Sequence, residues 1–131
     1  MQRRSFLMTA AASALAAPFW PGRAVAQTSA RARTLAAAME AVRARDWPTA
    51  LDLARTLPDQ PARDVVLWHW LRAPEGRFED YLDFLARCGD WPGLPLMRRR
   101  GEDAIPEGAS ADALRLFFGP DAPQTGTGSL R

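Results

Sequence analysis

Residues 45–51, RDWPTAL, recur in looser form as residues 89–94, GDWPGL, and this repeat decides the expected fold. The tryptophans of the two segments, Trp47 and Trp91, are 44 residues apart. A period in the forties built from short helices is typical of helix-pair solenoids, because each pair leaves an apolar face that only a neighbouring pair can cover. The repeat therefore predicts an all-α fold in which short antiparallel helix pairs stack as the start of an α-solenoid.

Apolar residues at three- and four-residue spacing predict the helices themselves. The expected helices cover residues 31–45, 48–57, 62–73 and 112–118, a fourth that starts at residue 78 and is ended by Gly89, and a shorter fifth that starts at residue 94. The fifth either ends around Gly101 or is interrupted there and continues to Ile105. Asp46 is placed to cap the second helix, and Pro48 suits its first turn. Nothing after residue 30 alternates like a strand, so no sheet is expected.

Large apolar side chains mark the expected core of this stack. Five of them are predicted to be structural: Trp47, Trp68, Leu82, Leu85 and Trp91. The third helix offers two alternative faces, one carrying Val65, Trp68 and Leu71 and the other Val66 and Trp70. The fourth helix has one expected apolar side, formed by Phe78, Tyr81, Leu82 and Leu85.

The positive net charge of +2 belongs to the start of the chain. The 131 residues have room for one modest domain, and they contain 17 arginines, no lysine and 15 acidic residues. The first 26 residues hold three of the arginines, so the remaining 105 carry 14 arginines against 15 acids, a net charge of −1. A near-neutral body lacks the basic face that phosphate binding requires, and no nucleic-acid partner is expected.

Residues 1–26 have the layout of a cleavable signal peptide. A charged start precedes an uncharged, alanine-rich run, and small residues precede the expected cleavage between Ala26 and Gln27, with Ala24 at the other small position. The run is shorter than the roughly 20 residues that span a bilayer, so no stable membrane anchor is expected. The predicted location is the periplasm.

The export signal resembles the twin-arginine pattern. Its residues are Arg3, Arg4, Phe6 and Leu7. Gln2 and Met8 depart from the usual pattern, and general secretion is the alternative route.

No catalytic, cofactor-binding or metal-binding residue is expected. The single cysteine, Cys88, excludes an intrachain disulfide, and with the single histidine, His69, it cannot form a zinc cluster. Trp68, His69 and Trp70 could be imagined as a sugar-stacking platform. However, adjacent helical residues point about 100° apart, which favours packing between helices.

Two charged clusters also have structural explanations. Glu79, Asp80 and Asp83 lie opposite the apolar side of their helix, as a solvated face would. Residues 98–100, RRR, fall in the last turn of a predicted helix, where cations interact favourably with the helix dipole.

Several stretches together resemble the N-terminal helical region of soluble lytic murein transglycosylases. They are residues 62–68 (ARDVVLW), 71–72 (LR), 78–87 (FEDYLDFLAR), 90–94 (DWPGL), 98–102 (RRRGE) and 123–126 (PQTG). The resemblance covers about residues 35–128. It implies an α-superhelix that leads into a lysozyme-like domain, which cleaves the MurNAc–GlcNAc bond of peptidoglycan and leaves a 1,6-anhydro end.

The resemblance assigns no catalytic residue to this chain. The family's catalytic Glu is followed by Ser, and none of the five glutamates here precedes a serine. In the family that Glu would act as general acid while the C6 hydroxyl of the substrate attacks. This chain would therefore be scaffold, with a glycan strand as partner through the full-length enzyme and with the catalytic domain missing from it.

Two hypotheses follow for a chain divided into a signal peptide (1–26), a helical-repeat domain (27–119) and a Pro/Gly/Thr loop or linker (120–131). The first is the scaffold segment of a periplasmic lytic transglycosylase, inactive by itself. The second is a stand-alone exported helical module, similar to tetratricopeptide arrays, that binds a protein or peptidoglycan partner.

Overall fold

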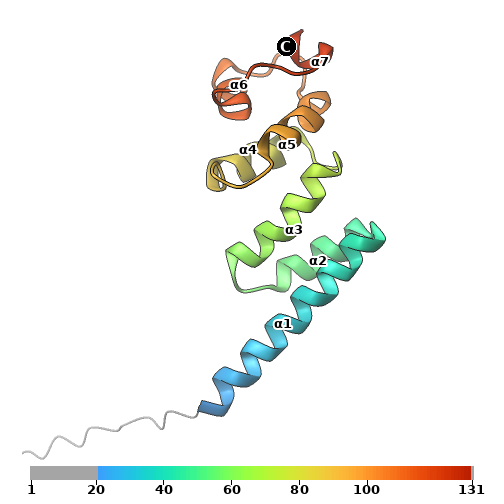
Figure 1. Ribbon diagram of the computed structural model, residues 1–131, viewed down its shortest axis with the longest axis vertical. Helices are drawn as coiled ribbons and strands as arrows, with labels where there is room; N and C mark the ends of the chain where they lie inside the picture. The colour runs from blue at the N-terminus through green and yellow to red at the C-terminus, as the bar shows by residue number, and fades with distance from the viewer. Residues whose placement is uncertain (1–20, 131) are drawn as a thin grey trace, which may run out of the picture.

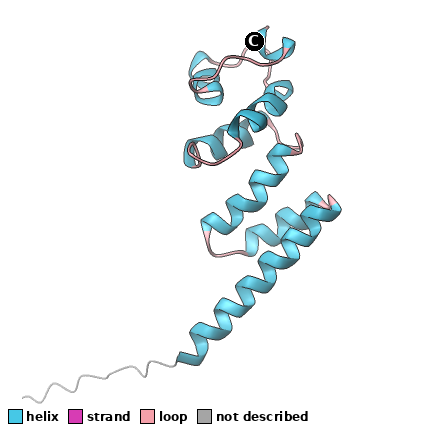
Figure 2. Cartoon of the chain, in the orientation of Figure 1, coloured by secondary structure: helices cyan, strands magenta, loops and turns pink. Residues whose placement is uncertain are grey.

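The computed structural model describes residues 21–130, and every regular element in this range is helical (Figure 2). The elements are α1 (Pro21–Ala44), α2 (Trp47–Thr56), α3 (Gln60–Arg72), α4 (Phe78–Arg87), α5 (Leu94–Gly101), the 3₁₀ turn η1 (Glu102–Ala104), α6 (Ala111–Phe118) and α7 (Gly126–Ser129). The prediction of an all-α fold is confirmed. The expected export residues Arg3, Arg4, Phe6 and Leu7 lie outside the described residues.

The helices stack along the long axis of the molecule (Figure 1). Helix α1 packs on α2, and α3 contacts both of them on one side and α4 and α5 on the other. Alternate helices also touch, α1 with α3, α3 with α5 and α4 with α6. This pattern of contacts is the one that stacked helix pairs produce.

Helix α1 starts earlier than the predicted residue 31 and contains Ala24, Ala26 and Gln27 of the expected cleavage site. Residues 26–33 are all exposed, and α1 reaches beyond the end of α2 in Figure 1. Only its second half enters the core, through Ala38, Ala41 and Val42. The first half of α1 therefore projects from the stack.

Most of the buried apolar residues form two clusters, and α3 contributes to both. The lower cluster comprises Ala38, Ala41, Val42, Ala50, Ala54 and Val66. The upper cluster comprises Leu71, Phe78, Tyr81, Phe84, Leu85, Cys88, Leu94, Met97, Ile105 and Phe117. Val66 and Leu71 lie on the same helix, so α3 joins the two clusters.

This double role explains why neither face predicted for α3 is correct as a whole. The structure buries Val66 from one predicted face and Leu71 from the other, because α3 has a packed neighbour on each side. Val65, Trp68 and Trp70 are half-buried.

Helix α4 also differs from its predicted apolar side. Phe84 is 1% exposed and its ring meets that of Trp91 edge to face, with centroids 5.6 Å apart. Leu82, expected in this core, is half-buried and packs on the upper cluster from outside. Leu85 is buried as expected.

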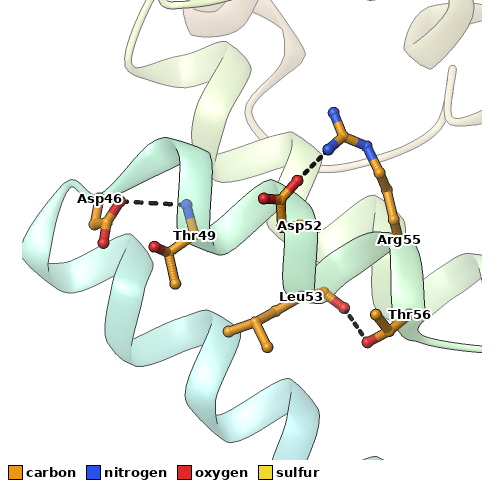
Figure 3. Close-up of polar contacts among 6 residues, drawn as sticks. All are labelled: Asp46, Thr49, Asp52, Leu53, Arg55 and Thr56. Carbon is orange, nitrogen blue, oxygen red and sulfur yellow. Dashed lines mark hydrogen bonds and ion pairs between the residues drawn. The ribbon is translucent and has the colours of Figure 1, made fainter.

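The two DWP segments begin helices in different ways. The Asp46 carboxylate accepts a hydrogen bond from Thr49 N at 3.2 Å, which confirms the predicted cap of α2. Figure 3 shows this cap, with the Asp52–Arg55 ion pair and the bond from Thr56 Oγ1 to the Leu53 carbonyl farther along α2. After the second segment, α5 begins only at Leu94, because Gly93, with a left-handed φ of 76°, first turns the chain.

The run of three arginines ends α5, as predicted, but Arg98 has a further role. Its side chain is buried, and its Nε donates to the Phe117 carbonyl at 2.6 Å. Its Nη1 contacts the Asp121 carboxylate at 2.8 Å. Arg98 therefore ties α5 to the end of α6.

The expected loop or linker 120–131 contains the short helix α7 and is anchored by a buried carboxylate. Glu102 is fully buried and accepts hydrogen bonds from Gln124 N and Thr125 N, both at 2.7 Å, and from the Thr125 hydroxyl. A β carbon at Gly128 would collide with the same carboxylate. The segment after α6 is therefore held against η1.

Replacing Glu102 by Gln should destabilise the fold by about 2 kcal/mol, because a buried amide cannot accept all the bonds that the carboxylate accepts. The measurement is urea unfolding of E102Q beside E79Q, which alters an exposed glutamate of α4. Equal stability of the two variants would show that the contact contributes nothing.

Candidate binding groove

The described part of the chain has a groove of about 550 Å³ on its surface. It lies where the α1–α2 corner, the C-terminal end of α3 and the middle of α5 meet. Its charged and titratable lining residues are Arg43, Arg45, Arg72, Arg100, His69 and Glu75. Four guanidinium groups thus face one carboxylate, and we call this hollow the arginine groove.

Two smaller hollows continue the arginine groove along α5. Both share Pro74 and Arg100 with it, and one of them also reaches Arg99, Asp103 and Thr125. Thr125 belongs to the segment that Glu102 holds in place. The concave surface therefore extends from the α1–α2 corner towards α7.

Arg45 enters the groove from a strained backbone position. Its φ is 58°, the left-handed conformation that usually carries glycine at the end of a helix. Arg45 N donates to the Val42 carbonyl at 3.1 Å and Asp46 N to the Ala41 carbonyl at 2.9 Å, which is the Schellman pattern. An arginine stands where local backbone energetics favour glycine.

Arg72 is held in place by stacking and by the backbone around it. Its guanidinium carbon lies 4.1 Å from the centroid of the Trp68 ring. The Trp68 indole N–H in turn donates to the Pro92 carbonyl at 2.9 Å. The Nε of Arg72 is buried and has no hydrogen-bond partner among residues 21–130, so stacking on Trp68 is the contact that positions the guanidinium.

Arg100 approaches the same point from α5. Its Nη1 donates to the Arg72 carbonyl at 2.6 Å, which fixes one edge of the guanidinium at the end of α3. Within residues 21–130, Arg45, Arg72 and Arg100 have no ion pair with a carboxylate, whereas Arg43 pairs with Glu40. Three arginines without an ion pair therefore line one concave surface, with Glu75 as the carboxylate among the lining residues.

The groove also alters the protonation of His69. Burial, and then the positive charge of Arg72, lower the pKa of the imidazole below 6.5. The ring meets that of Trp68 edge to face, with centroids 4.9 Å apart. His69 is thus held in its neutral form at neutral pH, and an anion in the groove would raise its pKa.

The three residues considered for sugar stacking make different contacts. His69 lines the groove, Trp68 supports Arg72 beside it, and Trp70 packs on the upper cluster. Trp47 is half-buried, lines the groove and packs on the lower cluster, whereas Trp91 packs on the upper cluster. No contiguous sequence pattern points to the groove, since its arginines come from three separate helices and a turn.

The other polar candidates lie outside the groove. Glu79 and Asp83 are exposed as expected, and Asp80 is half-buried, where its carboxylate accepts from Arg77 N at 2.8 Å. Burial, and then the charge of Asp64, raise the pKa of the Cys88 thiol to about 11. Within the described residues no cluster of His, Cys, Asp or Glu could hold a metal ion.

Comparison of the chain with known protein families, with curated proteins and with solved structures finds no match. Among residues 21–130, no helix combines the length and the apolar character that crossing a membrane requires.

Replacing Arg45 by Gly should stabilise the fold by about 1 kcal/mol, because glycine adopts the left-handed conformation without steric cost. The matched control is R43G, two residues earlier and still helical, which should destabilise by about 1 kcal/mol. Thermal unfolding of both variants shows whether each substitution raises or lowers the stability. A loss of stability in R45G would contradict the strain assigned to Arg45.

The imidazole of His69 should titrate below pH 6.5, and R72Q should raise its pKa, because the variant removes a positive charge that disfavours the imidazolium. Burial, the larger cause of the lowered pKa, remains in R72Q, so the pKa of His69 in this variant should stay below 6.5. Proton NMR of the single histidine measures this directly. R115Q, on α6, is the control, and an equal shift in both variants would rule out a local effect of Arg72.

Proposed function

We propose that the chain is the scaffold segment of a periplasmic lytic transglycosylase, an enzyme that cleaves the MurNAc–GlcNAc bond of peptidoglycan to a 1,6-anhydro product. The observation that carries the proposal is the concave surface along successive helix pairs, from the α1–α2 corner past α3 to α5 and α7. A surface of this kind can hold an extended polymer against several helices at once.

The contact at Glu102 supports the same proposal. Residues 98–102 and 123–126 are two of the stretches that resemble lytic transglycosylases, and they are separated along the chain by α6. The Glu102 carboxylate joins them through Gln124 and Thr125. The two stretches thus form one structural unit, which gives a physical reason for their occurring together.

The upper end of the stack supports a role within a longer assembly. The large apolar residues exposed in the described part of the chain are Leu116 (42%) on α6 and Leu130 (87%) after α7. Helices α6 and α7 lie at one end of the stack (Figure 1), where a further helix pair would pack. In this proposal a following segment covers Leu116 and Leu130, and a separate catalytic domain supplies the Glu-Ser general acid.

The first test is co-sedimentation of the purified chain with insoluble peptidoglycan sacculi. The chain should pellet with the sacculi and release no 1,6-anhydro product, because it binds the polymer but holds no catalytic acid. A chain that stays in the supernatant, or that releases the product by itself, would contradict the scaffold role.

The second test is the DNA sequence that follows codon 131 in the source genome. The proposal predicts further helical repeats and a Glu-Ser motif in a lysozyme-like domain, in frame or after one frameshift. Unrelated sequence after a stop codon would overturn the proposal and favour a stand-alone exported helical module that binds a protein or peptidoglycan partner.

A further inference from the structure

We infer that the arginine groove is a binding site for carboxylate groups, and that the ligand is the stem peptide that a peptidoglycan strand carries. The inference deepens the proposed function and rests on it for the source of the carboxylates. It assigns Arg45, Arg72 and Arg100 as the ligand-binding residues.

The lining of the groove carries more positive than negative charge. Glu75 is the single carboxylate among its lining residues, and Arg45, Arg72 and Arg100 have no carboxylate partner within residues 21–130. Three guanidinium groups around one hollow attract an anion strongly, since each has up to five donors in a planar fork that matches a carboxylate. A neutral sugar chain would leave these charges uncompensated.

The guanidinium groups of Arg72 and Arg100 are already positioned before a ligand binds. Trp68 stacks against Arg72, and the Arg72 carbonyl accepts a hydrogen bond from Arg100 at 2.6 Å. Side chains fixed before binding lose less conformational entropy when the ligand arrives. The side chains of Arg72 and Arg100 are thus fixed before the ligand binds, unlike those of mobile surface arginines.

The backbone at Arg45 is strained, because its φ of 58° is left-handed. Backbone strain concentrates at functional sites, where the surrounding structure maintains it. Glycine would relieve the strain but would remove the guanidinium from the groove. A carboxylate-binding role explains why an arginine occupies this position.

Size and lining favour a peptide over a small inorganic anion. The groove measures about 550 Å³, within the range of roughly 300 to 1,000 Å³ found for small-molecule sites. Trp47, Leu96 and Pro74 supply apolar wall between the arginines. A short peptide with several carboxylates and apolar side chains matches both features.

The test is calorimetric titration of the purified chain with a disaccharide tetrapeptide released from peptidoglycan. The comparison ligand is the same muropeptide after its carboxylates have been converted to amides, and a neutral chitooligosaccharide is the second control. The amidated ligand should bind at least about tenfold more weakly, because it loses the charge-assisted hydrogen bonds. Raising the salt concentration should weaken binding of the unmodified ligand only.

Variants of the chain locate the site. R72Q and R100Q should each raise the Kd for the muropeptide about threefold to tenfold, through the loss of a charge-assisted contact. R45G should weaken binding in the same range while raising the melting temperature, so its loss of binding cannot be attributed to unfolding. R115Q is the control, since Arg115 is exposed on α6 and pairs with Asp112.

The outcomes separate the two proposals. If the amidated muropeptide binds as tightly as the unmodified one, or if R45G binds normally, the carboxylate site is overturned, while pelleting with sacculi would still support the scaffold. If neither muropeptide binds, the carboxylate site is also overturned. If, in addition, the chain does not pellet with sacculi, the proposed function fails as well.

Discussion

The position of α3 between two apolar clusters is the constraint on which the rest of the structure depends. Val66 faces α1 and α2, whereas Leu71 faces the cluster built from α4, α5 and α6. The Tyr81 hydroxyl donates to the Leu71 carbonyl at 2.8 Å and adds a polar contact between α3 and α4. Because α3 contacts α1, α2, α4 and α5, a shift of this one helix would open both clusters at once.

The arginine groove is a consequence of the same arrangement. The C-terminal end of α3 presents His69 and Arg72 where the α1–α2 corner on one side and α5 on the other leave space. The turn after α1 brings Arg45 to this space, and α5 brings Arg100. Packing in the two clusters therefore determines which charges meet, although none of the arginines of the groove is itself a core residue.

Much of the fold follows from local sequence patterns, and the groove does not. Three- and four-residue spacing located α2 to α6, and Asp46 at a helix start identified its cap. Neither predicted face of α3 is correct as a whole, because a helix that packs on two neighbours buries more than one stripe. On α4, Phe78, Tyr81 and Leu85 are buried as predicted, and Phe84 was missed. The burial of Arg98 and the bonds of Glu102 depend on residues about twenty positions away. Contacts between residues so far apart in the sequence produce no pattern within a short stretch of it.

His69 provides the most direct measurement, because it is the single histidine and lies in the arginine groove. Its proton NMR signals can be followed while the disaccharide tetrapeptide is added to the full chain. We expect a saturable change in these signals and a rise in the pKa of the imidazole, because bound carboxylates offset the charge of the neighbouring arginines. Unchanged His69 signals at ligand concentrations that saturate binding would show that the ligand binds elsewhere and would contradict the account.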